Sequence, residues 1–140
     1  MSDEAHARLP RSSVEFAYEW FCRAVAVKCI AFGLFYWIRL IGLYEGDLWR
    51  FDLMPLHWQV AGAMLSVLFP IAAIGLWMAV SWGPVLWVIA AAAEIVMHGA
   101  LPDLFGYRPG LVALHVATLI GLVGFRVMLY LQHLQRVERY

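Results

Sequence analysis

The stretch Pro84–Leu101, PVLWVIAAAAEIVMHGAL, decides the fold of this chain. It is long and apolar enough for a membrane-spanning helix, and it carries one carboxylate, Glu94, well inside it. A carboxylate at that depth must face the interior of a bundle, pair with a cation or take up a proton. His98 follows one turn later on the same face, and Ala90–Ala93 would let a neighbouring helix approach closely. Two interpretations of Glu94 stay open, namely a structural interhelical contact and a functional site.

The composition is that of a membrane protein. The 140 residues are enough for one domain, and they are 64% hydrophobic and 14% charged, with a mean hydropathy of +0.74. Ten basic and ten acidic residues balance, which indicates no nucleic-acid partner. The seven Trp and six Tyr gather near the ends of the apolar runs, as aromatic belts do at membrane interfaces. We therefore expect the lipid bilayer to be the surroundings of this chain.

The apolar runs predict an all-α fold, an integral membrane four-helix bundle. A polar tail, 1–11, precedes the helical region 12–134, and a short tail, 135–140, follows it; the spans are expected at about 24–44, 57–80, 84–101 and 111–134. Ser12 and Glu15 have the spacing of a capping box, so the first helix should begin there. The first span reads as uncleaved, because it starts late and no small-residue cleavage site follows it. Pro70 should kink the second span.

The positive charges in the flanking segments predict how the chain is threaded. Arg8, Arg11 and Arg23 lie before or early in the first span, and two further arginines follow the last span. The loops 45–56 and 102–110 hold one arginine each. Cytoplasmic flanks carry an excess of Lys and Arg. The pattern therefore predicts that both termini are cytoplasmic.

With this threading, four polar residues of three spans fall in the outer half of the bundle: Arg39, Glu94, His98 and His115. We predict that Glu94 pairs with Arg39, with His98 or His115 completing its hydrogen bonds, because the two charges lie at matched depth. Two alternatives remain open, namely that Glu94 meets a histidine alone or faces Arg126. This set is the candidate polar site within the membrane.

Two cations belong to the inner half, Lys28 and Arg126. No buried acid is available there, so we expect their side chains to reach lipid phosphates or the cytoplasm. The two cysteines, Cys22 and Cys29, share a face of one helix. Their Cα atoms should lie about 10 Å apart, too far for a disulfide, so they are interpreted as packing residues.

Four segments of the chain resemble a known family: FDLMPLHWQ, GLWMAVSWGPVLW, the Glu94–His98 helix and PDLFGYRP. The chain is similar over most of its length to DUF6163, a family of short four-span membrane proteins of alphaproteobacteria with unknown function. The resemblance implies a multi-pass protein of the bacterial inner (plasma) membrane. It implies no activity, substrate or catalytic residue.

The motifs favour a non-enzymatic role, because no nucleophile–base set, phosphate-binding loop, HExxH or CxxC is present. The first hypothesis is an accessory or interaction protein of a membrane complex, through a membrane-protein partner or self-association. The alternative is a small-molecule, quinone, lipid or proton-handling site around Arg39, Glu94, His98 and His115. No cofactor is predicted, although haem or metal binding through His98 and His115 is kept as a third hypothesis.

Overall fold

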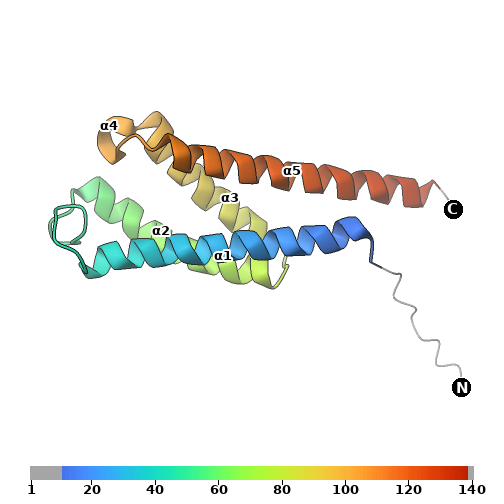
Figure 1. Cartoon of the computed structure of the whole chain (residues 1–140), viewed down its shortest axis with the longest axis horizontal. Coiled ribbons are helices and arrows are strands. Elements are labelled where there is room, and N and C mark those ends of the chain that lie inside the picture. The colour runs from blue at the N-terminus through green and yellow to red at the C-terminus, as the bar shows by residue number, and fades with distance from the viewer. Residues whose placement is uncertain (1–10, 139–140) are drawn as a thin grey trace, which may run out of the picture.

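The structure, a computed structural model, describes residues 11–138. Of the predicted terminal tails, residues 1–10 and 139–140 lie outside this range. The described residues form helices and contain no strand, and four helices are long and apolar enough to cross a membrane. The prediction of an all-α, multi-pass membrane fold is confirmed. Figure 1 shows the first and the last long helix running along the length of the molecule, with the helices between them in the sequence inclined to that direction.

The first long helix, α1 (Ser13–Ile41), has well-defined ends. Ser12 Oγ accepts a hydrogen bond from the Glu15 backbone N–H at 3.2 Å, and the Glu15 carboxylate accepts one from the Ser12 N–H at 2.9 Å. This is the predicted capping box, which satisfies two backbone N–H groups that the helix leaves free. The helix ends at Gly42, whose φ of +76° is the left-handed conformation that favours glycine. The first helix therefore stops three residues before the predicted boundary at 44.

The second long helix, α2 (Leu56–Trp77), contains Pro70 without a break. Proline has no N–H to donate to the carbonyl one turn earlier, which here belongs to Ser66. The Trp37 indole N–H of α1 donates to that carbonyl at 3.1 Å instead. Gly33 of α1 makes room for the proline ring, since a Cβ there would lie 3.0 Å from it. The kink that the sequence predicts at Pro70 stays a prediction.

A tight turn joins α2 to α3 (Trp82–Ile95). We expected the second span to reach residue 80 and the third to start at 84, but residues 78–81 form the turn instead. The turn begins early because the start of α3 lies against the backbone of α2. A Cβ on Gly83 would lie 2.4 Å from the Gly75 carbonyl carbon. Pro84 fits inside the first turn of α3, where its missing N–H leaves no bond unmade.

The third span changes character at its C-terminal end, where α3 continues as the π-helix η1 (Val96–Ala100). The segment 102–110, predicted to be a loop, contains the short helix α4 (Pro102–Phe105). The last long helix, α5 (Pro109–Val137), extends beyond the predicted span 111–134 at both ends. It begins at Pro109, which suits the first position of a helix.

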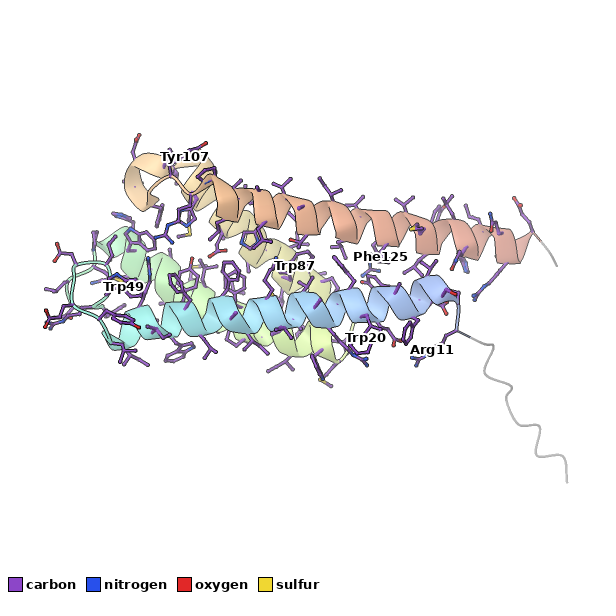
Figure 2. All side chains as sticks on the ribbon, viewed as in Figure 1. Arg11, Trp20, Trp49, Trp87, Tyr107 and Phe125 are labelled. Carbon is purple, nitrogen blue, oxygen red and sulfur yellow. The ribbon has the colours of Figure 1, made fainter. Side chains whose placement is uncertain are left out.

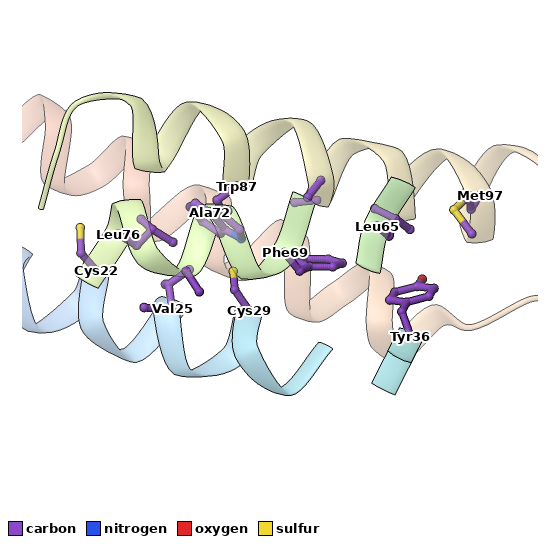
Figure 3. Close-up of a cluster of buried hydrophobic side chains, with 14 of the residues drawn as sticks. Cys22, Val25, Cys29, Tyr36, Leu65, Phe69, Ala72, Leu76, Trp87 and Met97 are labelled. Atoms are coloured by element: carbon purple, nitrogen blue, oxygen red, sulfur yellow. The ribbon is translucent and has the colours of Figure 1, made fainter. Parts of the chain in front are cut away.

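The main hydrophobic core lies where α1, α2 and α3 meet. Figure 3 shows Phe69, Leu76 and Trp87 there, packed beside Val25 and Cys29. Helix α5 packs less completely, because His115 is its only buried residue in the described range. At the end of the molecule where α1 begins, Ser12 Oγ donates to the Gln132 side chain of α5 at 3.0 Å. The first turn of α1 and the last turns of α5 therefore lie at the same end, as Figure 1 also shows.

Candidate functional site

Glu94 is held by side chains from two neighbouring helices. It lies on α3 one residue before the helix ends, and it is 1% exposed. The Tyr36 hydroxyl of α1 donates to Glu94 Oε1 at 2.5 Å, and His115 Nε2 of α5 is hydrogen-bonded to Glu94 Oε2. Figure 3 shows the Tyr36 ring rising from α1 with its hydroxyl oxygen directed toward α3 and η1. A buried network of three residues therefore ties α1, α3 and α5 together.

The predicted ion pair between Arg39 and Glu94 is wrong. Among residues 11–138, the Glu94 carboxylate is hydrogen-bonded to the His115 imidazole, and no ion pair involves Arg39. Tyr36, and not Arg39, occupies the position on α1 that faces the carboxylate. The alternative with Arg126 is also wrong, because that side chain is exposed and its guanidinium lies 5.5 Å from the Tyr18 ring centre. The histidine alternative is the correct one, with Tyr36 added.

Arg39 lies among aromatic rings. Its guanidinium carbon is 4.8 Å from the ring centre of Phe35, 4.9 Å from that of Trp49 and 4.8 Å from that of Trp58. The side chain is 3% exposed, and its Nε has no hydrogen-bond partner within residues 11–138. Figure 2 places Trp49 in the loop after α1. Cation–π contacts stabilise a guanidinium, but they satisfy none of its N–H donors.

A cavity of about 260 Å³ adjoins Arg39. Its walls combine cationic, polar and aromatic side chains from α1, α2, η1 and the start of α5: Phe32, Phe35, Tyr36, Arg39, Trp58, His98 and Arg108, with Ala31 and Leu111. The cavity therefore brings together two guanidinium groups, and its walls contain no carboxylate. Such a site is complementary to an anion that also carries an apolar part.

His98 lies on η1 and is 1% exposed. Its Nδ1 is 2.9 Å from the Gly106 carbonyl oxygen, which can only accept, so Nδ1 carries a proton. This bond fixes the ring against the segment before α5. A single π-helical turn is often found at functional sites, because the extra residue re-aims the side chains that follow it. Here the turn places His98 on the cavity wall.

Lys28 and Arg126 differ in their surroundings. Lys28 is half-buried, and its Nζ donates to Thr118 Oγ1 of α5 at 3.0 Å and lies 5.2 Å from the Trp87 ring centre. Figure 2 shows Trp87 in the region between α1 and α5. The expectation that Lys28 simply reaches the membrane surface is therefore wrong. Arg126 is exposed, and its contact with lipid phosphates stays a prediction.

Metal or haem ligation by His98 and His115 gains no geometric support. No group of three or more His, Cys, Asp or Glu side chains that could hold a metal ion occurs in the described part of the chain. One ring nitrogen of each histidine is already bonded: Nδ1 of His98 to the Gly106 carbonyl oxygen, and Nε2 of His115 to Glu94. Cys22 and Cys29 are buried free thiols.

Sequence reasoning missed Tyr36, Trp58 and Arg108. The tyrosine precedes Arg39 by three residues on α1, and this spacing puts both on one face of the helix. The spacing could have pointed to Tyr36, but the interpretation of aromatic residues as interface belts obscured it. Trp58 and Arg108 are brought to the cavity by α2 and by the connection before α5. The presence of these two residues at the cavity could not be deduced from their spacing along the sequence.

Comparison with known proteins gives one match. No curated protein and no solved structure matches the chain. A family model described as a family of unknown function, DUF6163, matches residues 16–133, which include most of the four long helices and the residues of the polar network. The match agrees with the resemblance seen in the sequence. The chain therefore belongs to the DUF6163 family.

Proposed function

We propose that this protein binds an amphiphile with an anionic headgroup, in the cavity beside Arg39. The observation that carries the proposal is the buried guanidinium of that residue, whose Nε has no hydrogen-bond partner in the part of the chain that the structure describes. A buried charge is costly unless it is paired and hydrogen-bonded, and Arg presents its donors in a fork that suits phosphate or carboxylate oxygens. Arg108 adds a second such group to the same cavity.

The aromatic walls and the size of the cavity support an amphiphile. A volume of about 260 Å³ accommodates a small headgroup, and an acyl chain would have to continue outside it. The rings of Phe32, Phe35 and Trp58 offer apolar contact to the carbons next to the anionic group. The shared chemistry is therefore a phosphate or carboxylate attached to an apolar body.

Calorimetric titration of the full chain in a neutral maltoside detergent tests the proposal. The ligands are dihexanoylphosphatidylglycerol, octanoate, inorganic phosphate and zwitterionic dihexanoylphosphatidylcholine. We expect the anionic amphiphiles to bind more tightly than the zwitterion. Binding of inorganic phosphate as tight as that of phosphatidylglycerol would assign the site to a free anion. Equal binding of both phospholipids would refute recognition of negative charge.

Arg39→Met provides the variant, because methionine keeps an apolar stem and removes the charge. It should weaken binding of phosphatidylglycerol at least tenfold, which corresponds to about 1.4 kcal/mol. Arg50→Met is the matched control, since Arg50 is exposed, pairs with Asp52 at 2.7 Å and does not line the cavity. An equal loss in both variants would contradict a specific site.

A role as an accessory or interaction protein is a second candidate, and the surface of α5 favours it. His115 is the one buried residue of that helix in the described range, so most of its length is free to contact lipid or another protein. Ultracentrifugation in detergent and in lipid discs, with mass spectrometry of co-purified proteins, tests this. A single copy that purifies alone in both media would count against it.

We also propose that the protein resides in a bacterial inner membrane with both termini cytoplasmic, on the strength of the arginine bias. The contact between Ser12 and Gln132 supports a common side for the two ends of the helical region. Reporter fusions test the orientation. A periplasm-active reporter at Tyr140, together with a cytoplasm-active one in the loop 45–55, would refute it.

A further inference from the structure

The cavity beside Arg39 changes from apolar to cationic along its length. On the α1 wall, Ala31 and Phe32 lie at one end, and Arg39 lies at the other end, in the last turn of the helix. At 1.5 Å per residue, Ala31 and Arg39 are about 12 Å apart along the helix axis. Arg108 directly precedes α5. The cationic end is therefore the end at which α1 stops and α5 starts, and the apolar end lies deeper in the membrane-spanning region.

The cavity opens sideways, between α1 and α5. On the α1 wall, Ala31 and Phe35 are one turn apart and exposed, whereas Tyr36 is buried. Helix α5 runs in the direction opposite to α1 (Figure 1), and its Leu111 forms the other side of the opening. In a membrane, exposed apolar side chains of a spanning helix face lipid chains. The opening therefore leads from the interior of the cavity to the surrounding bilayer.

Toward the start of α1, the two helices come into contact and close the gap between them. The Phe32 ring lies beside that of His115 on α5, with ring centres 5.3 Å apart. One turn earlier, Lys28 Nζ donates to Thr118 Oγ1 at 3.0 Å. An apolar chain that leaves the cavity therefore has to pass Ala31 on its way into the bilayer.

Aromatic rings cover the cationic end. Trp49 from the loop after α1 and Trp58 of α2 lie 4.9 and 4.8 Å from the Arg39 guanidinium carbon, and Arg39 is 3% exposed. A dissolved anion would enter past Arg108, whose side chain is exposed, and would leave the apolar wall unused. A membrane lipid uses both ends of the cavity, because its headgroup and its chains have opposite polarity.

We propose that the ligand is an anionic phospholipid of the bilayer that enters between α1 and α5. Its headgroup reaches Arg39, and its acyl chains stay in the membrane against Ala31, Phe35 and Leu111. This inference rests on the proposed function and adds the source of the ligand and its route.

The order of the walls matches the order of headgroup and chain in a bilayer. One leaflet contributes about 15 Å of hydrocarbon, so the distance of about 12 Å from Arg39 to Ala31 spans most of a leaflet. A lipid can therefore bind without turning over. Because the opening faces the membrane, two acyl chains need no room inside the protein, which a cavity of about 260 Å³ would not provide.

Photolabelling of the full chain in lipid discs tests the route. The discs contain phosphatidylcholine and a minor fraction of phosphatidylglycerol that carries a diazirine in the middle of one acyl chain. A parallel sample carries the diazirine on phosphatidylcholine instead, and mass spectrometry of peptides locates the label. We expect phosphatidylglycerol to label the segments around Ala31 and Leu111 more strongly than phosphatidylcholine does. Around the exposed residues Ile120 and Val123 of α5, both lipids should label equally.

Ala31→Trp narrows the opening, and the exposed position of Ala31 allows the larger side chain without disturbing the core. We expect the excess label from phosphatidylglycerol to be lost, as it should be in Arg39→Met. The label is read at the segment around Leu111, which neither substitution alters. Val27→Trp is the matched control, because Val27 lies one turn earlier, is 57% exposed and does not line the cavity. An excess that persists in Ala31→Trp would overturn the proposed route.

The outcomes separate this inference from the proposed function. Equal labelling of the segments around Ala31 and Leu111 by both lipids, with dihexanoylphosphatidylglycerol still bound in the calorimetric titration, would overturn the route and leave the anion site in place. No binding in the titration and no excess label would overturn both. Since both readings are made on the unmodified protein, neither depends on a variant that fails to fold.

Discussion

Removing one hydroxyl should show how much the network contributes to stability. Tyr36→Phe keeps the ring, which stacks on Phe69 with centres 6.1 Å apart, and deletes the donor to Glu94 Oε1. Hydrogen bonds to charged groups contribute about 1.5–3 kcal/mol in soluble proteins, and interhelical ones in membranes average about 0.6 with a maximum near 1.7. The tyrosine is 3% exposed and its partner 1%, so water cannot replace the lost donor. We therefore expect a loss near the upper membrane value, about 1.5 kcal/mol.

A double-mutant cycle with Glu94→Met isolates the contact. Methionine fills a similar volume and accepts only weakly, so Tyr36→Phe should cost almost nothing in that background. Unfolding in mixed micelles of maltoside and dodecyl sulfate, followed by tryptophan fluorescence, measures each free energy. Tyr130→Phe is the control, because that side chain is 63% exposed on α5. Equal losses for Tyr36→Phe in both backgrounds would show that the two residues are not coupled, and would refute the network.

Two further predictions concern the close contacts that set the helix arrangement. The free energy of unfolding is measured in the same mixed micelles. Gly83→Ala should destabilise the protein by about 1–3 kcal/mol, because its Cβ would meet backbone at 2.4 Å, whereas Gly124→Ala, with nothing within 4 Å, should stay within about 0.5 kcal/mol. Equal effects would contradict the tight turn. Trp37→Phe should cost about 0.6–1.7 kcal/mol, since it removes the donor to the Ser66 carbonyl. That loss should vanish in a Pro70→Ala background, where a backbone N–H replaces the indole; an undiminished loss would show that the proline does not free this carbonyl.

Much of the fold could be predicted, because it follows from local chemistry. Four apolar runs are long enough to span a bilayer, and the Ser12 capping box fixes the start of α1. The ends of α2 and α3 could not be predicted in the same way. They depend on the approach of Gly75 to Gly83, a contact between helices that leaves no trace in hydropathy. The π-helical turn before Leu101 is equally invisible to an apolar pattern.

Only part of the candidate site could be predicted, because the sequence does not show which faces of the helices meet. Depth along the membrane normal can be estimated from the sequence, so Glu94 and His115 could be placed in the same half. Depth says nothing about which face of a helix meets which neighbour, and Arg39 was therefore paired with the wrong group. Tyr36 was overlooked because its residue type is common at interfaces. Its hydroxyl satisfies the carboxylate that was assigned to the arginine.

The proposed function requires Arg39 to hold an anionic headgroup. The distance between the ligand phosphorus and the arginine nitrogen tests this most directly. Protein labelled with ¹⁵N-arginine is mixed with one equivalent of dihexanoylphosphatidylglycerol in a phosphate-free detergent, frozen, and examined by solid-state NMR for ³¹P–¹⁵N dipolar coupling. A guanidinium that donates to a phosphate oxygen places its nitrogen about 4 Å from phosphorus. We expect a coupling of that size, which Arg39→Met weakens and Arg50→Met leaves intact. A coupling of undiminished strength in Arg39→Met, or the absence of any coupling in the unmodified protein, would contradict it.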